Sequence, residues 1–426
     1  MIDNNSLKAW SWIPFLYFAE GLPYVLAMSV SVILYKRLGI SNTDIALYTS
    51  WLYLPWVIKP LWSPLVDMLK SKRTWILSMQ FIIAVLLAAI AFTIPSSSFF
   101  QITLAIFWLL AFASATHDIA ADGFYMLALT PHEQSLFVGV RTLFYRIANI
   151  AGQGLLVILA GSLETSFNDL SFAWSVVFMI ISGIFFILFV YQMFILPKPT
   201  VELISDDSVS AHTKNNFIEP FAEFFQKKNI FLIISFILVY RLGESQLVKL
   251  ASPFLLDKQI VGGLGLSTTE VGFVYGTAGI ISLTVGGLLG GVAVARNGLK
   301  HWLWWMLIAI NLPDLFYVYL AYSQTSNFVL INLCVIVEQF GYGFGFTAFL
   351  MYLIYISEGK YKTSSYAIAT GFMALGMMLP GMISGWIQQH LGYQLFFIWV
   401  CVSTLPAFII ARFIKIDAEF GKKNSK

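Results

Sequence analysis

Ten ionisable side chains lie inside hydrophobic segments of this chain, namely Glu20, Lys59, Asp118, Asp122, Arg146, Arg241, Glu244, Lys249, Asp314 and Glu338. Carboxyl groups can take up and release protons, whereas lysine and arginine bind anionic groups. A charge at the centre of a bilayer costs about 2.5–3.5 kcal/mol on insertion scales, so a chain that keeps ten of them must shield or use them. The set therefore predicts a polar path through a membrane.

The acidic pair Asp118 and Asp122 is the most specific local signal. The two residues are four positions apart, which places them on one face of a helix. The turn at 130–134 is short, so the helices before and after it are expected to be antiparallel neighbours. At about 1.5 Å per residue, Asp118 is then level with Arg146, and Asp122 with Arg141. We predict two acid–base pairs that either hold the helices together or include a proton-exchanging carboxylate and an anion-binding arginine.

Glu20 is the first candidate for a proton carrier. It lies in the hydrophobic run 17–26 with no arginine or lysine close to it in sequence, and apolar surroundings favour the protonated form of a carboxyl group. Pro23 follows it and removes one helical hydrogen bond, which suits a gate. The alternative is that Glu20 pairs with Lys59. His117, beside Asp118, is either a pH-sensitive group or, as we favour, a packed and hydrogen-bonded side chain.

The basic residues have competing interpretations as well. Lys59 either extends toward water or pairs with an acid, or it binds an anion. Arg241 and Glu244 are three residues apart and are expected to pair, whereas Lys249 lies deeper and is not expected to meet either. Asp314 is expected to be structural. The candidates for substrate binding are Lys59, Tyr145, Arg146, Tyr240, Arg241, Glu244, Lys249, Glu338 and Gln339, and those for structural or gating roles are Asp67, Arg141, Pro23 and Pro380.

Composition indicates which elements must position these residues. The chain has 426 residues, of which 58% are hydrophobic and 11% charged, and this composition is typical of a polytopic membrane protein and not of a soluble enzyme. Twelve hydrophobic runs of spanning length start near Trp10, Asp44, Thr74, Phe99, Ser135, Phe172, Asn229, Ser267, His301, Asn327, Tyr361 and Tyr393. We predict an all-α membrane protein with two six-helix bundles, residues 1–196 and 229–426, joined by a cytoplasmic linker, 197–228. Six plus six is the layout of the twelve-helix major facilitator fold.

The placement of basic residues predicts the orientation. If both termini are cytoplasmic, the outer loops carry only Lys36, Arg37 and Lys258, and nearly all other loop lysines and arginines are cytoplasmic. Cys334 and Cys401 lie in hydrophobic runs and define neither a disulfide framework nor a metal site. No metal-ligand cluster, nucleophile elbow or phosphate loop supports catalysis. We therefore expect no enzyme activity, no metal or cofactor and no nucleic-acid partner, but a monomer in the lipid bilayer that binds a small molecule and protons.

Six segments carry a resemblance to a known family: FAEGLP (18–23), KPLWSPLVD (59–67), FASATHDIAADGFYMLAL (112–129), YRIANIAGQG (145–154), YRLGES (240–245) and EQFGYGFGFTAFL (338–350). The chain resembles the AmpG-type muropeptide permeases, a branch of the major facilitator superfamily that is similar to the eukaryotic acetyl-CoA transporters. The resemblance implies a proton-driven importer in the bacterial inner membrane. It implies as cargo the anhydro-muropeptides released by cell-wall turnover, which consist of N-acetylglucosaminyl-anhydro-N-acetylmuramic acid with or without a peptide.

Two other functions remain open at this stage. One keeps the transporter and changes the cargo to an acetyl-CoA-like molecule or another organic anion. The other is a membrane enzyme or receptor. The residues themselves support a polar cargo that could carry negative charge, and they do not identify it.

Overall fold

Helices make up almost all of the chain in the computed structural model, which describes residues 4–69, 71–198, 219–359 and 361–422. In the first half, the helical runs are α1 (Asn4–Val25) with η1 (Leu26–Val30) and α2 (Ser31–Arg37); α3 (Asn42–Ser50) with η2 (Trp51–Tyr53) and α4 (Leu54–Leu69); α5 (Lys72–Thr93); α6 (Phe99–Ala128); α7 (Pro131–Asn149) with η3 (Ile150–Leu155) and α8 (Leu156–Phe167); and α9 (Leu170–Ile195).

The second half repeats this pattern of long helical runs. After the short α11 (Glu219–Phe225), the runs are α12 (Ile230–Val239) with α13 (Leu242–Leu256); α14 (Thr268–Val271) with η6 (Gly272–Gly279) and α15 (Ile280–Asn297), reached through η5 (Gln259–Val261); α16 (Leu299–Asn311) with η7 (Leu312–Asp314) and α17 (Leu315–Ser323); α18 (Phe328–Ile356); and α19 (Lys362–Ser403) with α20 (Leu405–Ala411). The last run turns at Gly392, whose φ of 70° a glycine adopts without strain.

These runs are long and apolar enough to cross a bilayer. Among the described residues, ten stretches meet that condition by length and hydropathy. One of them, Ser364–Ala411, contains two helices because of the turn at Gly392, and the run from α3 to α4 is a further helix. Large apolar side chains such as Phe194 and Phe231 are exposed, as expected of lipid-facing residues. The described residues thus contain the twelve helices that the hydropathy predicts.

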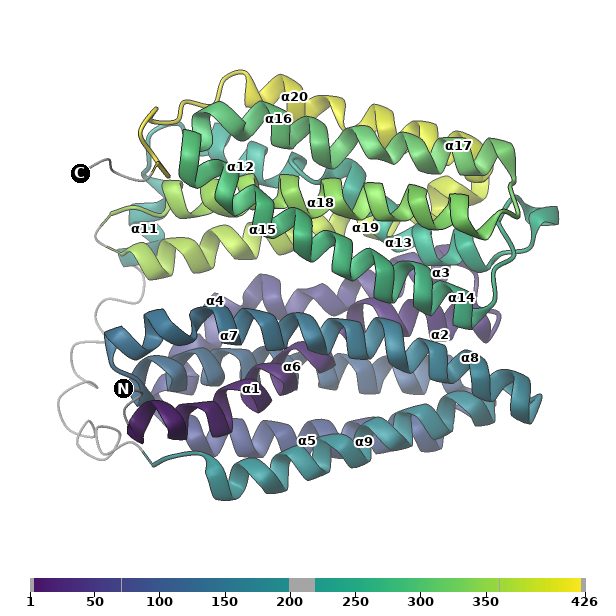
Figure 1. Ribbon diagram of the computed structural model, residues 1–426, viewed down its shortest axis with the longest axis horizontal. Coiled ribbons are helices and arrows are strands. Elements are labelled where there is room, and N and C mark those ends of the chain that lie inside the picture. The colour runs from purple at the N-terminus through teal and green to yellow at the C-terminus, as the bar shows by residue number, and fades with distance from the viewer. Residues whose placement is uncertain (1–3, 70, 199–218, 360, 423–426) are drawn as a thin grey trace. The chain divides into compact units, whose positions relative to one another are not determined.

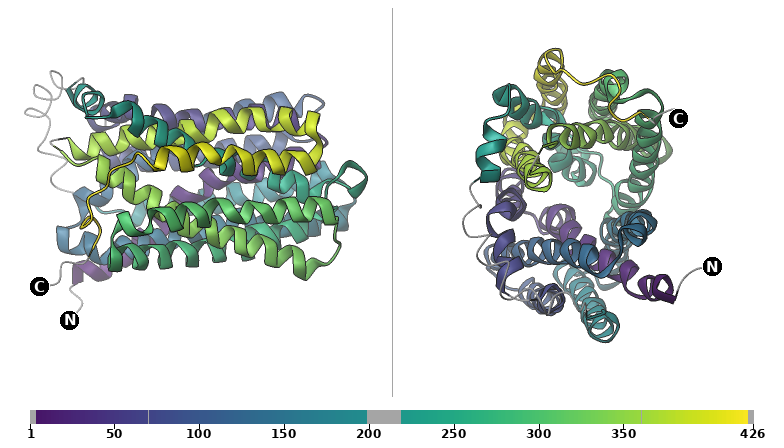
Figure 2. Two further views of the ribbon diagram at one scale, coloured as in Figure 1. Left: turned by 90° about the horizontal axis from the view of Figure 1, so that it is seen from above. Right: turned by 90° about the vertical axis from the view of Figure 1, so that its left-hand side faces the viewer.

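The chain forms two compact units, each seen as a set of helices in the end-on view of Figure 2. The N-terminal unit consists of residues 1–34 and 58–217, within which α5 packs along both α6 and α9. The C-terminal unit consists of residues 35–57 and 218–426. Residues 35–57 belong to the first half of the sequence but cluster with the helices of the second half, mainly α19. The domain ranges 1–196 and 229–426, drawn from the hydropathy, stay a prediction.

Widened π-helical turns interrupt three of the runs, at η1, η3 and η6. The turn η1 begins three residues after Pro23 and contacts η3. A side chain at Gly152 in η3 would collide with Val25, so this glycine permits the close approach. Turns of this kind often accompany functional sites, and this one follows Glu20 by six residues.

Small residues allow α15 and α18 to lie side by side in the C-terminal unit (Figure 1). At Gly343 on α18, an added Cβ atom would collide with the carbonyl group of Leu283 on α15. At Gly290 the corresponding atom would be 2.9 Å from the carbonyl oxygen of Phe344. Close backbone contact is how helices gain packing energy in lipid, where the hydrophobic effect does not drive them together.

Replacing Gly343 by Ala is therefore expected to destabilise the protein by about 1–3 kcal/mol, since the backbone of α15 must move. The matched control is Gly291→Ala, because the Cβ position of Gly291 has no atom within 4 Å. Thermal unfolding of the purified variants in detergent checks both. Equal melting temperatures for the two variants would contradict the close-packing account.

Candidate functional site

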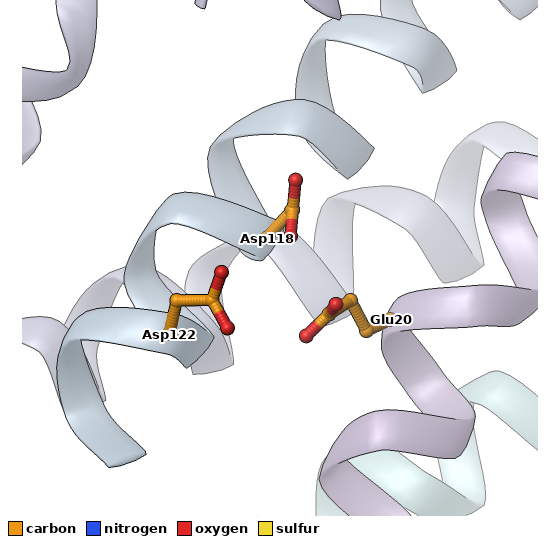
Figure 3. A group of neighbouring side chains, drawn as sticks. All are labelled: Glu20, Asp118 and Asp122. Atoms are coloured by element: carbon orange, nitrogen blue, oxygen red, sulfur yellow. The ribbon is translucent and has the colours of Figure 1, made fainter. Parts of the chain in front are cut away.

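Three carboxyl groups meet inside the N-terminal unit. Glu20 comes from α1, and Asp118 and Asp122 come from successive turns of α6 (Figure 3). One carboxylate oxygen from each residue lies within 4.8 Å of the corresponding oxygens of the other two. Figure 3 shows the carboxyl groups of Glu20 and Asp122 directed toward each other. The structure thus brings together the three acids that the sequence suggested for proton coupling, although one of them is almost 100 residues from the other two.

Two cations accompany these acids. The ammonium group of Lys59 on α4 pairs with Asp118, and the guanidinium group of Arg141 on α7 pairs with Asp122 at 2.7 Å. Both pairs are only partly buried, with side-chain exposures of 27% and 19% for the first and 30% and 37% for the second. We call these five residues the N-terminal charge cluster. Its partial exposure matters because protons must reach a site that exchanges them.

In the part of the chain that the structure describes, Glu20 is the carboxyl group of the N-terminal charge cluster that forms no ion pair. Its side chain is 8% exposed, and among the described residues its Oε2 atom has no hydrogen-bond partner. With all five groups ionised, three negative and two positive charges leave a net charge of −1. Since an uncompensated buried charge is costly, binding one proton brings the cluster to neutrality.

Two tyrosines that the sequence reasoning missed hold Arg141 in place. Its guanidinium carbon lies 4.5 Å from the ring centroid of Tyr17 and 5.3 Å from that of Tyr125. The hydroxyl group of Tyr17 also donates to Asp122, at 3.5 Å. Tyr17 precedes Glu20 by three residues, so its position on the same helix face was a usable signal. Cation–π contacts of this kind are worth about 0.5–2 kcal/mol.

One of the two predicted acid–base pairs is present and the other is wrong. Asp122 pairs with Arg141 as predicted, whereas Asp118 pairs with Lys59 and not with Arg146. The reason is the packing of α7, which runs along α1 and touches α6 only slightly. A short turn sets the depth of residues in two consecutive helices, but it does not make those helices neighbours. The Lys59 pairing was among the interpretations left open for that residue.

The N-terminal charge cluster also has the oxygen spacing of a cation site. A divalent cation would need most of the carboxylate charge for itself. Lys59 and Arg141 already neutralise two of the three carboxylates. The remaining single negative charge matches one proton better than a divalent metal ion.

A second group of acids lies in the C-terminal unit and is sealed from solvent. Glu244, Asp314 and Glu338 are 0%, 1% and 1% exposed. Within the described residues, both oxygens of Glu244 and both of Asp314 are without a hydrogen-bond partner. Arg241 approaches Glu244 only to 4.0 Å, so the predicted pair is long. Burying a carboxylate without a partner is costly.

The neighbours of these acids include several predicted site residues. The guanidinium group of Arg241 donates to the hydroxyl of Tyr342 at 2.5 Å and lies over the ring of Phe346. The amide of Gln339 donates to both oxygens of Glu338, at 3.2 and 3.0 Å. Tyr240 is completely buried, stacks on Phe349 and donates to a backbone carbonyl group, so its ring has no open face for a sugar.

Lys249 lies elsewhere in the C-terminal unit, as predicted, and meets residues from the first half of the chain. Its ammonium group donates to the hydroxyl of Thr49 at 2.9 Å and lies 5.3 Å from the ring centroid of Tyr53. A second set of contacts holds residues 35–57 in place within this unit. Asp257 pairs with Lys36 at 2.6 Å and accepts hydrogen bonds from Tyr393 and Asn42.

The other predicted residues lie in less distinctive places. Tyr145 and Arg146 are half-buried on α7, and Tyr145 contacts α1 at Gly21. Pro23 and Pro380 lie inside α1 and α19. Asp67 belongs to α4, but its side chain is outside the described part of the structure.

His117 has the packed environment that we favoured for it. It is fully buried. Its Nε2 atom lies 3.0 Å from the amide nitrogen of Gln80, which also donates to Gln192 at 2.8 Å. These three side chains connect α6, α5 and α9 through polar contacts.

Comparisons with known proteins identify the family to which the chain belongs. Residues 15–358 match the family model described as Major Facilitator Superfamily. The chain is 27% identical over 412 residues to "Putative transporter AmpG 4" of Rickettsia conorii, covering 93% of this chain and 94% of that one. It is 25% identical over 415 residues to "Anhydromuropeptide permease" of Escherichia coli, covering 96% of this chain and 80% of the relative.

Solved structures share the fold at low sequence identity. The nucleoside transporter NupG superimposes with a TM-score of 0.66 at 18% identity, covering 97% of this chain and all of that one. A D-xylose–proton symporter superimposes with a TM-score of 0.70 at 10% identity, covering 96% and 98%. These matches confirm the predicted twelve-helix fold.

Proposed function

Because this chain belongs to the Major Facilitator Superfamily, we propose that it is a proton-coupled importer of anhydro-muropeptides in the bacterial inner membrane, with both termini cytoplasmic. The protein is a multi-pass membrane protein of a transporter family. The proposal adds the driving ion, the cargo and the orientation. Each of these additions depends on a different observation.

The main support for proton coupling is that the N-terminal charge cluster contains three acidic groups but only two basic ones. Glu20 is the carboxyl group left over after Lys59 and Arg141 have paired with the two aspartates. It can change charge without breaking either pair. The acids of the C-terminal unit are weaker candidates, since their exposures of 0–1% are lower than those of Glu20, Asp118 and Asp122.

The mechanism follows from electrostatics. A proton bound at Glu20 makes the N-terminal charge cluster neutral, and a neutral cluster can be withdrawn from water at lower cost than a charged one. We infer that protonation at the outer side favours the conformational change that carries cargo inward. Release of the proton to the cytoplasm restores the negative charge and completes the import step. The inward proton gradient then drives net import.

The cargo assignment depends on similarity along most of the chain to relatives named for AmpG and for anhydromuropeptide transport. Such a cargo presents sugar hydroxyls and carboxylates. Of the cationic candidates in hydrophobic segments, Arg146, Arg241 and Lys249 suit the carboxylates, since Lys59 is paired with Asp118. With both termini cytoplasmic, nearly all loop lysines and arginines lie on the cytoplasmic side, and this bias supports the proposed orientation.

Uptake by proteoliposomes tests the proposal. We expect labelled N-acetylglucosaminyl-anhydro-N-acetylmuramic acid to accumulate when the outside is acidic and not when the gradient is collapsed with a protonophore. Uptake that ignores the gradient would remove proton coupling. Inhibition of uptake by acetyl-CoA, with direct uptake of acetyl-CoA itself, would instead support an organic-anion carrier.

A further inference from the structure

Lys249 is a buried cation in the C-terminal unit, and the described residues contain no carboxylate paired with it. It is 2% exposed. The ion pairs found among the described residues do not include it, and its one hydrogen bond goes to the neutral hydroxyl of Thr49. An ammonium group has three donors, and burying one that is incompletely satisfied is costly. A ligand that supplies the missing charge would offset this cost.

The surroundings of Lys249 include a second polar group without a partner. The hydroxyl of Ser50 is fully buried and, within the described part of the chain, has no hydrogen-bond partner. Ser50 follows Thr49 on α3. The Cβ position of Gly381 on α19 lies 2.9 Å from the Ser50 hydroxyl and 3.3 Å from the Lys249 side chain, so Ser50 and Lys249 flank the same point of α19.

Neighbouring groups favour an anion over a cation here. Thr49 donates its proton to the carbonyl oxygen of Ile45 and accepts from Lys249, so its hydrogen bonds are used. The ring of Tyr53 lies beside the ammonium group. The ammonium group and the Ser50 hydroxyl both have protons to donate. A carboxylate accepts two or more hydrogen bonds and brings the charge that Lys249 lacks.

We propose that Lys249 and Ser50, supported by Thr49, form an anion subsite that binds a carboxylate group of the cargo. This inference deepens the proposed function, on which the identity of the cargo rests. Glycine at position 381 lets α19 approach the two groups closely, since an added Cβ atom would lie 2.9 Å from the Ser50 hydroxyl. Residues 35–57 thus contribute directly to a binding site in the C-terminal unit.

The test compares one ligand with and without its charge. N-acetylglucosaminyl-anhydro-N-acetylmuramic acid has one free carboxylate, and its methyl ester has none. Binding of both to the full-length protein is measured by calorimetry for the wild type, Lys249→Met and Lys258→Met. The last variant is the matched control, because it removes one positive charge at an exposed position.

We expect Lys249→Met to weaken binding of the acid about ten- to hundredfold and to leave binding of the ester unchanged. Lys258→Met should change neither. An equal loss for acid and ester, or no loss for the acid, would overturn the subsite. Ser50→Ala should show the same pattern with a smaller loss.

A second measurement separates the subsite from the cargo. If the wild type binds neither acid nor ester, the proposed cargo is wrong. The subsite is then judged by thermal unfolding in acetate and phosphate against chloride. Stabilisation of the wild type by acetate or phosphate that disappears in Lys249→Met supports an anion subsite for another cargo. Identical behaviour of the two proteins overturns it.

Discussion

Replacing Glu20 by glutamine is expected to abolish concentrative uptake while leaving exchange of cargo across the membrane intact. Glutamine has nearly the shape of the protonated acid but cannot release a proton. The variant should therefore behave as a permanently protonated carrier. With the membrane potential clamped at zero, coupling of one proton to each cargo molecule lets a gradient of one pH unit drive about a tenfold accumulation of cargo. In the variant we expect about equal cargo concentrations inside and outside the vesicles.

The matched control for this prediction is Glu164→Gln. Glu164 is a buried glutamate of the same unit, which accepts a hydrogen bond from the indole of Trp174 at 2.8 Å. It is not part of the N-terminal charge cluster. Its variant should still accumulate cargo about tenfold under the same gradient. Wild-type accumulation by Glu20→Gln would show that the coupled proton is bound elsewhere.

Breaking the pair between Lys59 and Asp118 should cause the second large effect. Asp118→Asn leaves the ammonium group of Lys59 partly buried without its counter-charge. For a pair with exposures of 27% and 19%, we expect a destabilisation of about 2 kcal/mol, between the values for surface and buried pairs. Transport should fall with it, because an unpaired cation disturbs the charge balance on which Glu20 depends.

A double-mutant cycle measures that pair directly. The exchange of Lys59→Asp with Asp118→Lys should recover part of the lost stability and uptake. The coupling energy is expected to be about 0.5–3 kcal/mol. Arg146→Gln serves as the control, since its effect should add to that of Asp118→Asn without coupling. Coupling between Asp118 and Arg146 in place of Lys59 would refute the pairing seen in the structure.

The hydrophobic pattern alone was enough to predict the helices. Each run of about 20 apolar residues forms an α-helix in lipid, because the helix pairs the backbone N–H and C=O groups within the segment itself. The break at Gly392 also divides the last run where the sequence suggested. The site residues were predicted as types, since acids and bases in hydrophobic runs are costly and therefore informative.

The partners of those residues were harder to predict. Arg141 and Asp122 come from consecutive helices, so a depth argument found them. Lys59 and Asp118 are separated by one complete helix, α5, and their pairing depends on which helices become neighbours in space. The contact of Lys249 with Thr49 was even harder to predict from the sequence. It joins residues 200 positions apart, and one of them belongs to a segment that clusters with the opposite half of the sequence.

The most direct measurement of the central claim follows protons and cargo together. Proteoliposomes containing a trapped pH-sensitive dye receive external N-acetylglucosaminyl-anhydro-N-acetylmuramic acid with no gradient imposed. The account predicts that the lumen acidifies as cargo enters the wild type, with one proton per cargo. Glu20→Gln vesicles preloaded with unlabelled cargo should exchange it for labelled external cargo without acidification. Cargo entry through the wild type with no change in luminal pH, or equal acidification in Glu20→Gln, would contradict it.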